Sequence, residues 1–171
     1  EAAFWRLDLQ KLTATQHGSN GDVMGNIVRN YSQIELDHLI DRSMPQFAAR
    51  GTAIQSISDA SFANLHFGAA ACLSGWKFVR CAFRGANLVG CSLEGTSFVG
   101  CDLSGLDLSE STCKANDMSH ANLQGAKLPK DLTGWTFSGS NLATVDLSEC
   151  TGRGVTMTDA NLGDSRLPRN L

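Results

Sequence analysis

The sequence has few of the features that mark a membrane-spanning or strongly charged protein. Its 171 residues include only three prolines and one tyrosine, and no apolar run comes near the ~20 residues that a membrane-spanning helix needs. No secretory signal pattern is visible. The net charge is only -3, which is too small to indicate a nucleic-acid-binding protein. We therefore expect no membrane span and no nucleic acid partner.

Familiar catalytic motifs are absent as well. The chain has no phosphate-binding loop of the Walker type, no HExxH, no GxSxG and no glycine-rich dinucleotide motif after a strand. Its six cysteines lack the C-x2-C spacing of zinc sites. They lie at positions where the repeat requires a small apolar side chain, which favours free thiols in a reducing compartment. We expect no catalytic residue, no cofactor and no metal in this chain.

What the sequence does contain is a period of five residues. The stretch from Trp76 to Lys130 divides without remainder into eleven five-residue units. The first residue of a unit is mostly small, the second is mostly Asn, Asp or Ser, and the fifth is Gly in six units. A period of five fits neither a helix nor a strand, so it predicts a repeat architecture. The third residue is always apolar: Phe78, Phe83, Leu88, Leu93, Phe98, Leu103, Leu108, Cys113, Met118, Leu123 and Leu128.

The repeat continues on both sides of this stretch. Upstream units start near Gln55, and one residue is inserted near Gly75. Downstream, one residue is lost between Leu128 and Leu132, and the units then run to Leu167. The repeat therefore covers about two-thirds of the chain. The upstream centres are Ile57, Phe62, Phe67 and Cys72.

Residues 1–51 lack the repeat and are predicted to be a small, mainly α-helical cap. Residues 23–31 place their apolar side chains on one stripe, which predicts a helix. Ser32 followed by Glu35 has the spacing of a capping box and predicts the start of a second helix. The predicted domains are thus a helical segment over 1–51 and a repeat domain over 52–171. Both ends of the sequence look cut, which suggests a piece of a longer protein.

The units ANLVG and ANLQG resemble the A(D/N)LXX motif of the pentapeptide-repeat family. The resemblance implies an all-β fold, a right-handed quadrilateral β-helix with four units in each coil. It also implies that the first and centre residues point inward and that positions twenty apart stack. Three interior columns follow. They are Ile57, Phe78, Phe98, Met118, Phe137 and Met157; Phe62, Phe83, Leu103, Leu123, Leu142 and Leu162; and Phe67, Leu88, Leu108, Leu128, Leu147 and Leu167.

Four residues at departures from the pattern are the candidate partner-binding residues. Trp76 and Trp135 take first positions where a small residue is expected, so either the indoles lie outward or the coil widens. Outward tryptophans would suit a binding face. Lys130 also falls on a first position, and its corner should bend outward because a buried unpaired ammonium is unfavourable. Gly152 at a unit centre predicts a loop that presents Arg153.

The favoured function is a non-catalytic protein-binding solenoid, because repeat rods offer extended faces to partners. A helical segment followed by a pentapeptide β-helix is similar to the domain order of type III secreted bacterial effectors, including HECT-like ubiquitin ligases. This similarity implies the partner-binding region of a larger protein with a flanking domain. It also implies a location in the bacterial cytoplasm or, after secretion, in a host cell.

Two alternatives remain open. One is a DNA mimic that inhibits or protects a type II topoisomerase, as the quinolone-resistance pentapeptide proteins do. Residues 51–171 contain eleven acidic and nine basic residues, a net of -2. That is weak mimicry of DNA, which carries a charge every ~1.7 Å. The other alternative is a structural spacer within a larger polypeptide.

Overall fold

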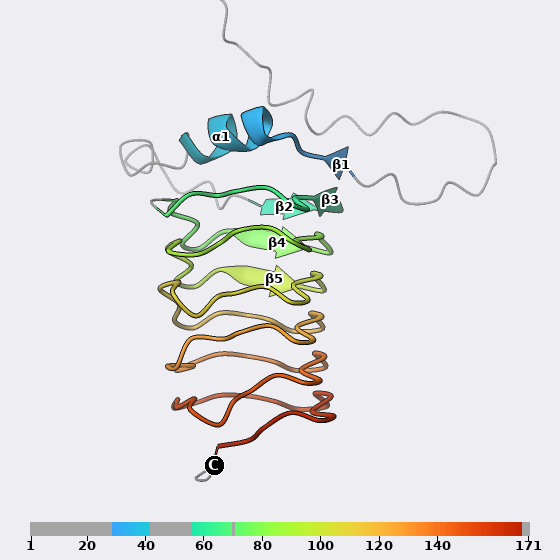
Figure 1. The fold of residues 1–171 in the computed structure, drawn as a ribbon, viewed down its shortest axis with the longest axis vertical. Helices are drawn as coiled ribbons and strands as arrows, with labels where there is room; N and C mark the ends of the chain where they lie inside the picture. Colours follow the sequence, from blue (N-terminus) through green and yellow to red (C-terminus); the bar gives the residue numbers. More distant parts are fainter. Residues whose placement is uncertain (1–28, 42–55, 70, 169–171) are drawn as a thin grey trace, which may run out of the picture.

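The fold is a stack of coils with a helix at one end (Figure 1). A computed structural model of the chain describes residues 29–41, 56–69 and 71–168. Beyond the last strand, single parallel bridges join successive coils. This arrangement is a β-helix, as the motif resemblance implies. Its regular elements are β1 (Arg29–Asn30), α1 (Gln33–Asp41), β2 (Ser56–Ser58), β3 (Ala60–Ser61), β4 (Lys77–Val79) and β5 (Ser97–Val99).

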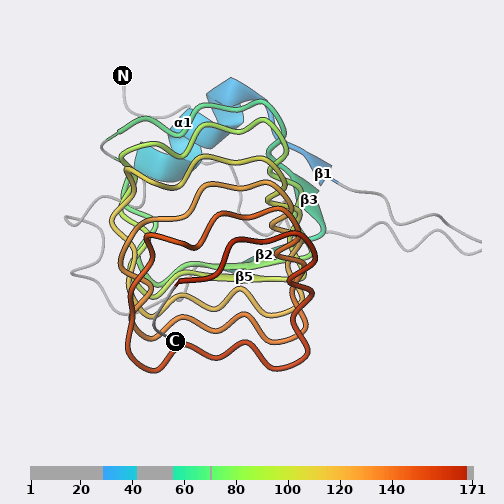
Figure 2. The same ribbon diagram turned by 60° about the horizontal axis from the view of Figure 1, so that its bottom comes forward.

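Each complete coil has four sides, and the stacked coils share one outline (Figure 2). We number the sides by the centre residues of the second coil: Phe78 for side 1, Phe83 for side 2, Leu88 for side 3 and Leu93 for side 4. Sides 1 and 3 are therefore opposite each other. The coils, numbered first to sixth, are 56–75, 76–95, 96–115, 116–134, 135–154 and 155–168.

The predicted stacking of positions about twenty apart is confirmed. On side 1, Ile57 aligns with Phe78 in the β2–β4 pair, and Phe78 aligns with Phe98 in the β4–β5 pair. Parallel bridges continue this register on sides 1 and 2 down to the sixth coil. On side 3 they join the first coil to the second, the third to the fourth and the fifth to the sixth. In the second to fifth coils, every centre residue of the three predicted columns is buried.

Backbone hydrogen bonds fix the coils to one another in a repeated pattern. The N–H of Leu103 donates to the carbonyl of Asn122 at 2.8 Å, and the N–H of Asn122 donates back to the carbonyl of Cys101 at 2.8 Å. The corner that follows needs a positive φ, which Gly105 supplies at 69°. The five-residue period therefore reflects one inward centre, one interstrand exchange and one corner in each unit.

The inserted residue lies one corner earlier than predicted. Cys72 bridges to Ser92, an outward second position, so Cys72 is not the centre of its unit. The centre is Leu73, which is 1% exposed and donates its N–H to the carbonyl of Ser92. The insertion therefore falls between Phe67 and Leu73. The larger apolar side chain takes the inward position above Leu93, which explains why the predicted Cys72 centre is wrong.

Helix α1 begins at the predicted capping box. The N–H and the hydroxyl of Ser32 both donate to Oε2 of Glu35 at 2.9 Å, and the N–H of Glu35 donates to Oγ of Ser32 at 3.3 Å. The helix predicted over 23–31 is wrong at its end. Arg29–Asn30 instead form β1, which pairs in parallel with Ala60–Ser61. Pairing with the first coil overrides the helical pattern there. Residues 1–28 and 42–51 of the predicted cap lie outside the described residues.

The segment around α1 packs on the first coil. The ring of Tyr31 stacks on that of Phe62 with centroids 4.7 Å apart, and Phe62 stacks on Phe83 at 5.1 Å. Leu36 of α1 is fully buried in the same core. Side 2 therefore carries a continuous aromatic stack from Tyr31 into the second coil.

Candidate protein-binding faces

The two tryptophans singled out by the sequence lie in the interior. Trp76 is 4% exposed and Trp135 is fully buried. Each ring centroid lies 5.4–5.7 Å from that of the centre phenylalanine of its own unit. Only the small residues Thr96 and Asn116 separate them in the first-position column of side 1, which leaves room for both indoles. The outward alternative is therefore wrong, and a partner cannot reach either ring at the surface of the folded coils.

The same column contains two buried polar atoms without partners. Nδ2 of Asn116 donates to the carbonyls of Leu93 at 2.5 Å and Thr96 at 3.2 Å. Oδ1 of Asn116 and Nε1 of Trp135 have no hydrogen-bond partner among the described residues. An unpaired buried polar atom is destabilising, so the packing of the column must hold these groups in place.

Lys130 points outward, as predicted. Pro129 is buried in its place, and Nζ of Lys130 lies 3.6 Å from Oε2 of Glu149. The two side chains are 81% and 79% exposed, so their ion pair is weak. The ammonium of Lys130 is therefore accessible to a partner.

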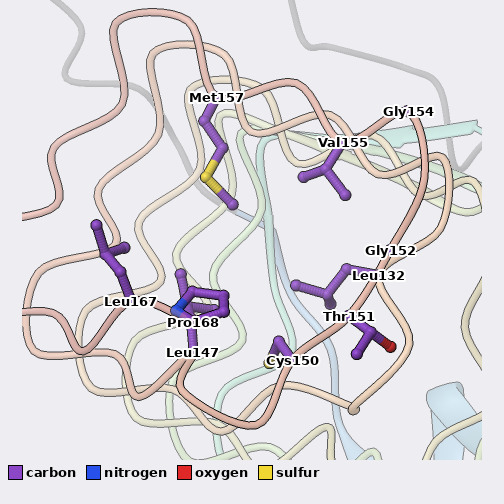
Figure 3. A pocket seen from close by; sticks show the side chains of 10 residues that line it. All are labelled: Leu132, Leu147, Cys150, Thr151, Gly152, Gly154, Val155, Met157, Leu167 and Pro168. Atoms are coloured by element: carbon purple, nitrogen blue, oxygen red, sulfur yellow. The ribbon is translucent and has the colours of Figure 1, made fainter. Parts of the chain in front are cut away.

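Arg153 is also exposed, at the corner where Gly152 leaves the core without a side chain. A Cβ at Gly152 would lie 2.9 Å from the carbonyl carbon of Leu132 and 2.9 Å from Cγ2 of Val155. Beside Gly152 the end of the stack has a hollow of about 250 Å³, lined mainly by apolar side chains that include Leu132 and Met157 (Figure 3). Sequence reasoning found the missing core group but not this hollow.

Substituting Gly152 by alanine should destabilise the fold because the new methyl group meets the backbone of Leu132. We expect a loss of ~1–3 kcal/mol in the free energy of unfolding, the usual range for overpacking. Gly163→Ala is the control, since its Cβ would come only within 3.2 Å of a side-chain oxygen. The control should change stability by less than ~1 kcal/mol. Urea unfolding measures both variants, and equal losses would contradict this account of Gly152.

The feature that sequence reasoning missed is the concentration of charge on side 3. Within the described part of the chain, seven charged side chains project from this side in two columns, and none of them is buried. In both columns the sign alternates from coil to coil. The signal was present as a spacing of nineteen to twenty residues at the second and fifth positions of the units. The first column is Asp107, Lys127, Asp146 and Arg166, and the second is Glu110, Lys130 and Glu149.

Local hydrogen bonds keep the acids of the first column ionised. Nζ of Lys127 lies 3.1 Å from Oδ2 of Asp107, and the hydroxyl of Ser109 donates to Oδ1 of the same carboxylate at 2.5 Å. The Ser109 hydroxyl, with smaller help from its N–H and from Lys127, holds the pKa of Asp107 below its usual value. The same arrangement lowers the pKa of Asp146. Both carboxylates therefore stay charged under mildly acidic conditions.

Side 2 differs sharply from side 3. Its second positions form a hydrogen-bonded ladder in which Asn161 donates to Asn141, Asn141 to Asn122, and Asn122 to Asp102, at 3.0–3.1 Å. Each of these side chains also accepts a backbone N–H two residues on. Their polar groups are thus largely satisfied within the chain, and this side offers a partner fewer free charges than side 3.

We next consider the possible metal ligands and the cysteine thiols among the described residues. No cluster of three or more His, Cys, Asp or Glu side chains able to hold a metal occurs among them. Within the same residues, no helix is long and apolar enough to cross a membrane. Cys81 and Cys101 stack one coil apart, as predicted, and the N–H of Cys81 donates to Sγ of Cys101 at 3.3 Å. Both thiols are free.

The cysteines should differ strongly in reactivity. Burial raises the pKa of Cys91 to about 11 and that of Cys113 to about 12. At pH 8 this pKa leaves only about one Cys91 thiol in a thousand ionised. Cys91 should therefore react slowly, because the thiolate is the nucleophile. Iodoacetamide at pH 8 followed by peptide mass spectrometry should label the half-buried Cys72 first. Cys91 and Cys113 should react only in denaturant, and labelling as fast as Cys72 would contradict their burial.

Together these features define a class: a four-sided β-helical solenoid with a packed interior and polar faces of unequal charge. Residues 77–112 and 131–167 match the family model of pentapeptide repeats, in eight copies. These two stretches therefore carry pentapeptide repeats, as the motif resemblance implied.

Several solved structures are similar to the chain, among them the pentapeptide repeat proteins HetL and Rfr23. HetL, involved in heterocyst differentiation regulation in the cyanobacterium Nostoc sp. strain PCC 7120, is 24% identical over 68% of this chain and 69% of its own, with a TM-score of 0.36. Rfr23 from the cyanobacterium Cyanothece 51142 is 19% identical over 68% and 86%, with a TM-score of 0.31. A trypsin-treated form of QnrB1, a plasmid-mediated fluoroquinolone resistance protein, is 25% identical over 68% and 65%, with a TM-score of 0.31. No curated protein sequence matches the chain.

Proposed function

We propose that the β-helix is a non-catalytic protein-binding module and that its partner contacts side 3. The supporting observation is the contrast between inward and outward positions. The inward side chains are buried in the core, whereas the charged side chains project outward and are concentrated on side 3. Lys130 lies in one of the two charged columns, and Arg153 is exposed on the neighbouring side 4. The two buried tryptophans take no part in this proposal.

Reversing charge on side 3 tests the proposal. The partner is first captured from the native host cell with the tagged chain. The dissociation constant of its complex is then measured with the parent chain and with the Lys130→Glu and Arg153→Glu variants. We expect at least about tenfold weaker binding for Lys130→Glu, because rim charges steer and orient association. Lys77→Glu makes the same change on the exposed surface of side 1, opposite side 3. Equal weakening by Lys77→Glu, or no weakening by Lys130→Glu, would overturn the proposal.

The module is further proposed to be the partner-binding region of a larger bacterial effector-like protein, with a ubiquitin ligase as one form of it. The support is the order of elements, with α1 leading into the first coil. The proposed location is the bacterial cytoplasm or a host cell, and the free, mostly buried cysteines suit such a reducing compartment. The full-length reading frame tests this part: a downstream domain with a reactive cysteine supports a ligase, and its absence removes that form.

DNA mimicry of a topoisomerase substrate is the main alternative. Against it, the acids of side 3 alternate with bases instead of forming a continuous negative stripe. A supercoiling assay with purified gyrase separates the two functions. We expect no inhibition, and potent dose-dependent inhibition would replace the present proposal by mimicry. A spacer role, the third possibility, predicts that no surface variant alters any interaction.

We also propose that α1 caps the first coil. The amide of Gln33 pairs with the backbone of His66, since Nε2 donates to its carbonyl at 2.7 Å and its N–H donates to Oε1 at 2.9 Å. This pairing imitates the exchange that a preceding coil would supply. Leu36 closes the core beneath the helix. A covered end protects a solenoid from association through its exposed edge.

A pair of substitutions on α1 tests the cap. Leu36→Asp places a charge in the fully buried position and should lower the free energy of unfolding by ~3 kcal/mol or more. Ile34→Asp, on the same helix at 71% exposure, should change it by less than ~0.5 kcal/mol. Thermal melts and light scattering follow stability and aggregation. A Leu36→Asp variant as stable and monodisperse as Ile34→Asp would show that α1 is not a cap.

A further inference from the structure

We infer that side 3 of one chain binds side 3 of a second copy of the same chain, with the two rods antiparallel. The inference rests on the proposed function, because it names a partner for the face assigned there. It is carried by the order of charges along the rod, by their exposure and by the small residues between the two columns.

From the third coil to the sixth, side 3 presents one sign of charge in each coil. Successive coils are about 4.8 Å apart, so the face alternates in sign along the rod at that spacing. The order is negative, positive, negative, positive. The third coil carries Asp107 and Glu110, the fourth Lys127 and Lys130, the fifth Asp146 and Glu149, and the sixth Arg166.

This order is complementary to itself when it is reversed. Consider a two-fold axis that lies between the two faces, perpendicular to the rods, at the level between the fourth and fifth coils. This axis turns one copy end for end and places each column opposite the same column of the second copy. Lys127 then faces Asp146 of the second copy, and Asp107 faces its Arg166. A parallel arrangement with the two side 3 faces in contact would place each coil opposite the same coil of the second copy. Like charges would then repel in each of the third to sixth coils. The pattern therefore favours the antiparallel pair and disfavours the parallel one.

The cations of this face are exposed to solvent, although each is ion-paired within its own chain. Lys127 is 74% exposed and Arg166 is 78% exposed at their side chains. Between the columns lie Ser109 and Ser148, whose hydroxyls are turned back onto the carboxylates of Asp107 and Asp146. In the third to fifth coils the large side chains between the columns are buried, whereas in the sixth coil Leu167 is 45% exposed beside Arg166.

The acids also retain room for a second cation. Each ion pair within the chain is exposed and uses one oxygen at 3.1–3.6 Å, while a carboxylate accepts several hydrogen bonds. Exposed pairs are individually weak and are screened by salt. The antiparallel dimer should therefore be reversible and should dissociate as ionic strength rises.

Sedimentation equilibrium of the folded chain tests the inference. At about 20 mM salt we expect a reversible monomer–dimer equilibrium that weakens at least about tenfold at about 500 mM salt. Lys127→Asp should weaken dimerisation at least about tenfold at low salt, because two carboxylates then face each other. Arg84→Glu, an equivalent reversal on the exposed surface of side 2, should leave it unchanged. A chain that stays monomeric at low salt and ~1 mM protein overturns the inference, whatever the variants do.

A charge exchange separates contacts between chains from contacts within one chain. Combining Lys127→Asp with Asp146→Lys restores opposite charges across the two-fold axis. Within one chain it sets like charges side by side, at positions 107 and 127 and at positions 146 and 166. The double variant should therefore recover dimerisation to within about threefold while its melting temperature falls. A double variant that dimerises as poorly as Lys127→Asp contradicts the antiparallel pairing.

The same measurements distinguish this inference from the proposed function. If the chain is monomeric at low salt but Lys130→Glu still weakens capture of another protein, side 3 binds partners and self-association is wrong. If the chain dimerises as described but no side 3 variant affects any other protein, the second copy is the partner of this face.

Discussion

Replacing Leu108 by aspartate should leave the repeat domain unfolded. Leu108 is fully buried in the middle of the side 3 column, between the second and fourth coils. The change removes ~1.5–3 kcal/mol of apolar burial and adds the larger penalty of placing a carboxylate in an apolar interior. Because a domain of this size is stable by only ~5–15 kcal/mol, the sum removes most or all of its stability. Circular dichroism and a thermal melt of the purified variant measure the loss.

The control places the same residue on an outward position. Gln124 is exposed directly after the buried centre Leu123, so Gln124→Asp adds a carboxylate without entering the core. We expect its melting temperature to stay within a few degrees of the parent chain. A soluble Leu108→Asp variant with an unchanged melting curve would show that the register assigned to the coils is wrong.

Truncating Trp135 to alanine should cause the second largest loss. The indole is fully buried beside Phe137, and its removal leaves a large cavity in the side 1 column. A change of this kind lowers the free energy of unfolding by ~3–5 kcal/mol. Trp135→Phe keeps an aromatic ring and removes the unpaired Nε1, so it should lose no more than ~1.5 kcal/mol.

The two Trp135 variants also decide where the indole lies. An outward indole would tolerate alanine with little effect on stability and would show the fluorescence of a water-exposed ring. Urea unfolding of both variants is the measurement. Equal and small losses would return Trp135 to the surface and restore it as a candidate contact residue.

The interior was predictable because one rule sets it. Every unit needs an apolar centre, and the spacing of those centres already orders the columns that include Phe78 and Leu108. Even the lost residue before Leu132 could be located from the spacing alone. The insertion could not, because Cys72 and Leu73 are both apolar and only packing against the next coil selects the leucine.

Other features depend on neighbours that are distant in sequence. The capping box at Ser32 is local and was predicted correctly, whereas β1 forms only because the first coil offers it a partner. The burial of Trp76 and Trp135 depends on the small residues one coil away. Sequence reasoning treated each tryptophan as a departure from its own unit, and so it missed the space that Thr96 and Asn116 provide.

The charge columns of side 3 were missed for a related reason. Each acid or base, taken in its own unit, fits an outward position and needs no explanation. Their alternation appears only when residues such as Asp107 and Lys127 are compared one coil apart. Of the four candidate contact residues, Lys130 and Arg153 are accessible and the two tryptophans are not.

The most direct test of the binding proposal is site-specific photo-crosslinking. A benzophenone amino acid is placed at position 130 on side 3 or at position 77 on side 1, both of which are exposed. The labelled chains are irradiated in the native host cell, and the cross-linked polypeptides are identified by mass spectrometry. The account predicts a discrete cross-linked protein, a second copy of the chain included, from position 130 and none from position 77. Cross-links from position 77 alone, or equally from both positions, would contradict it.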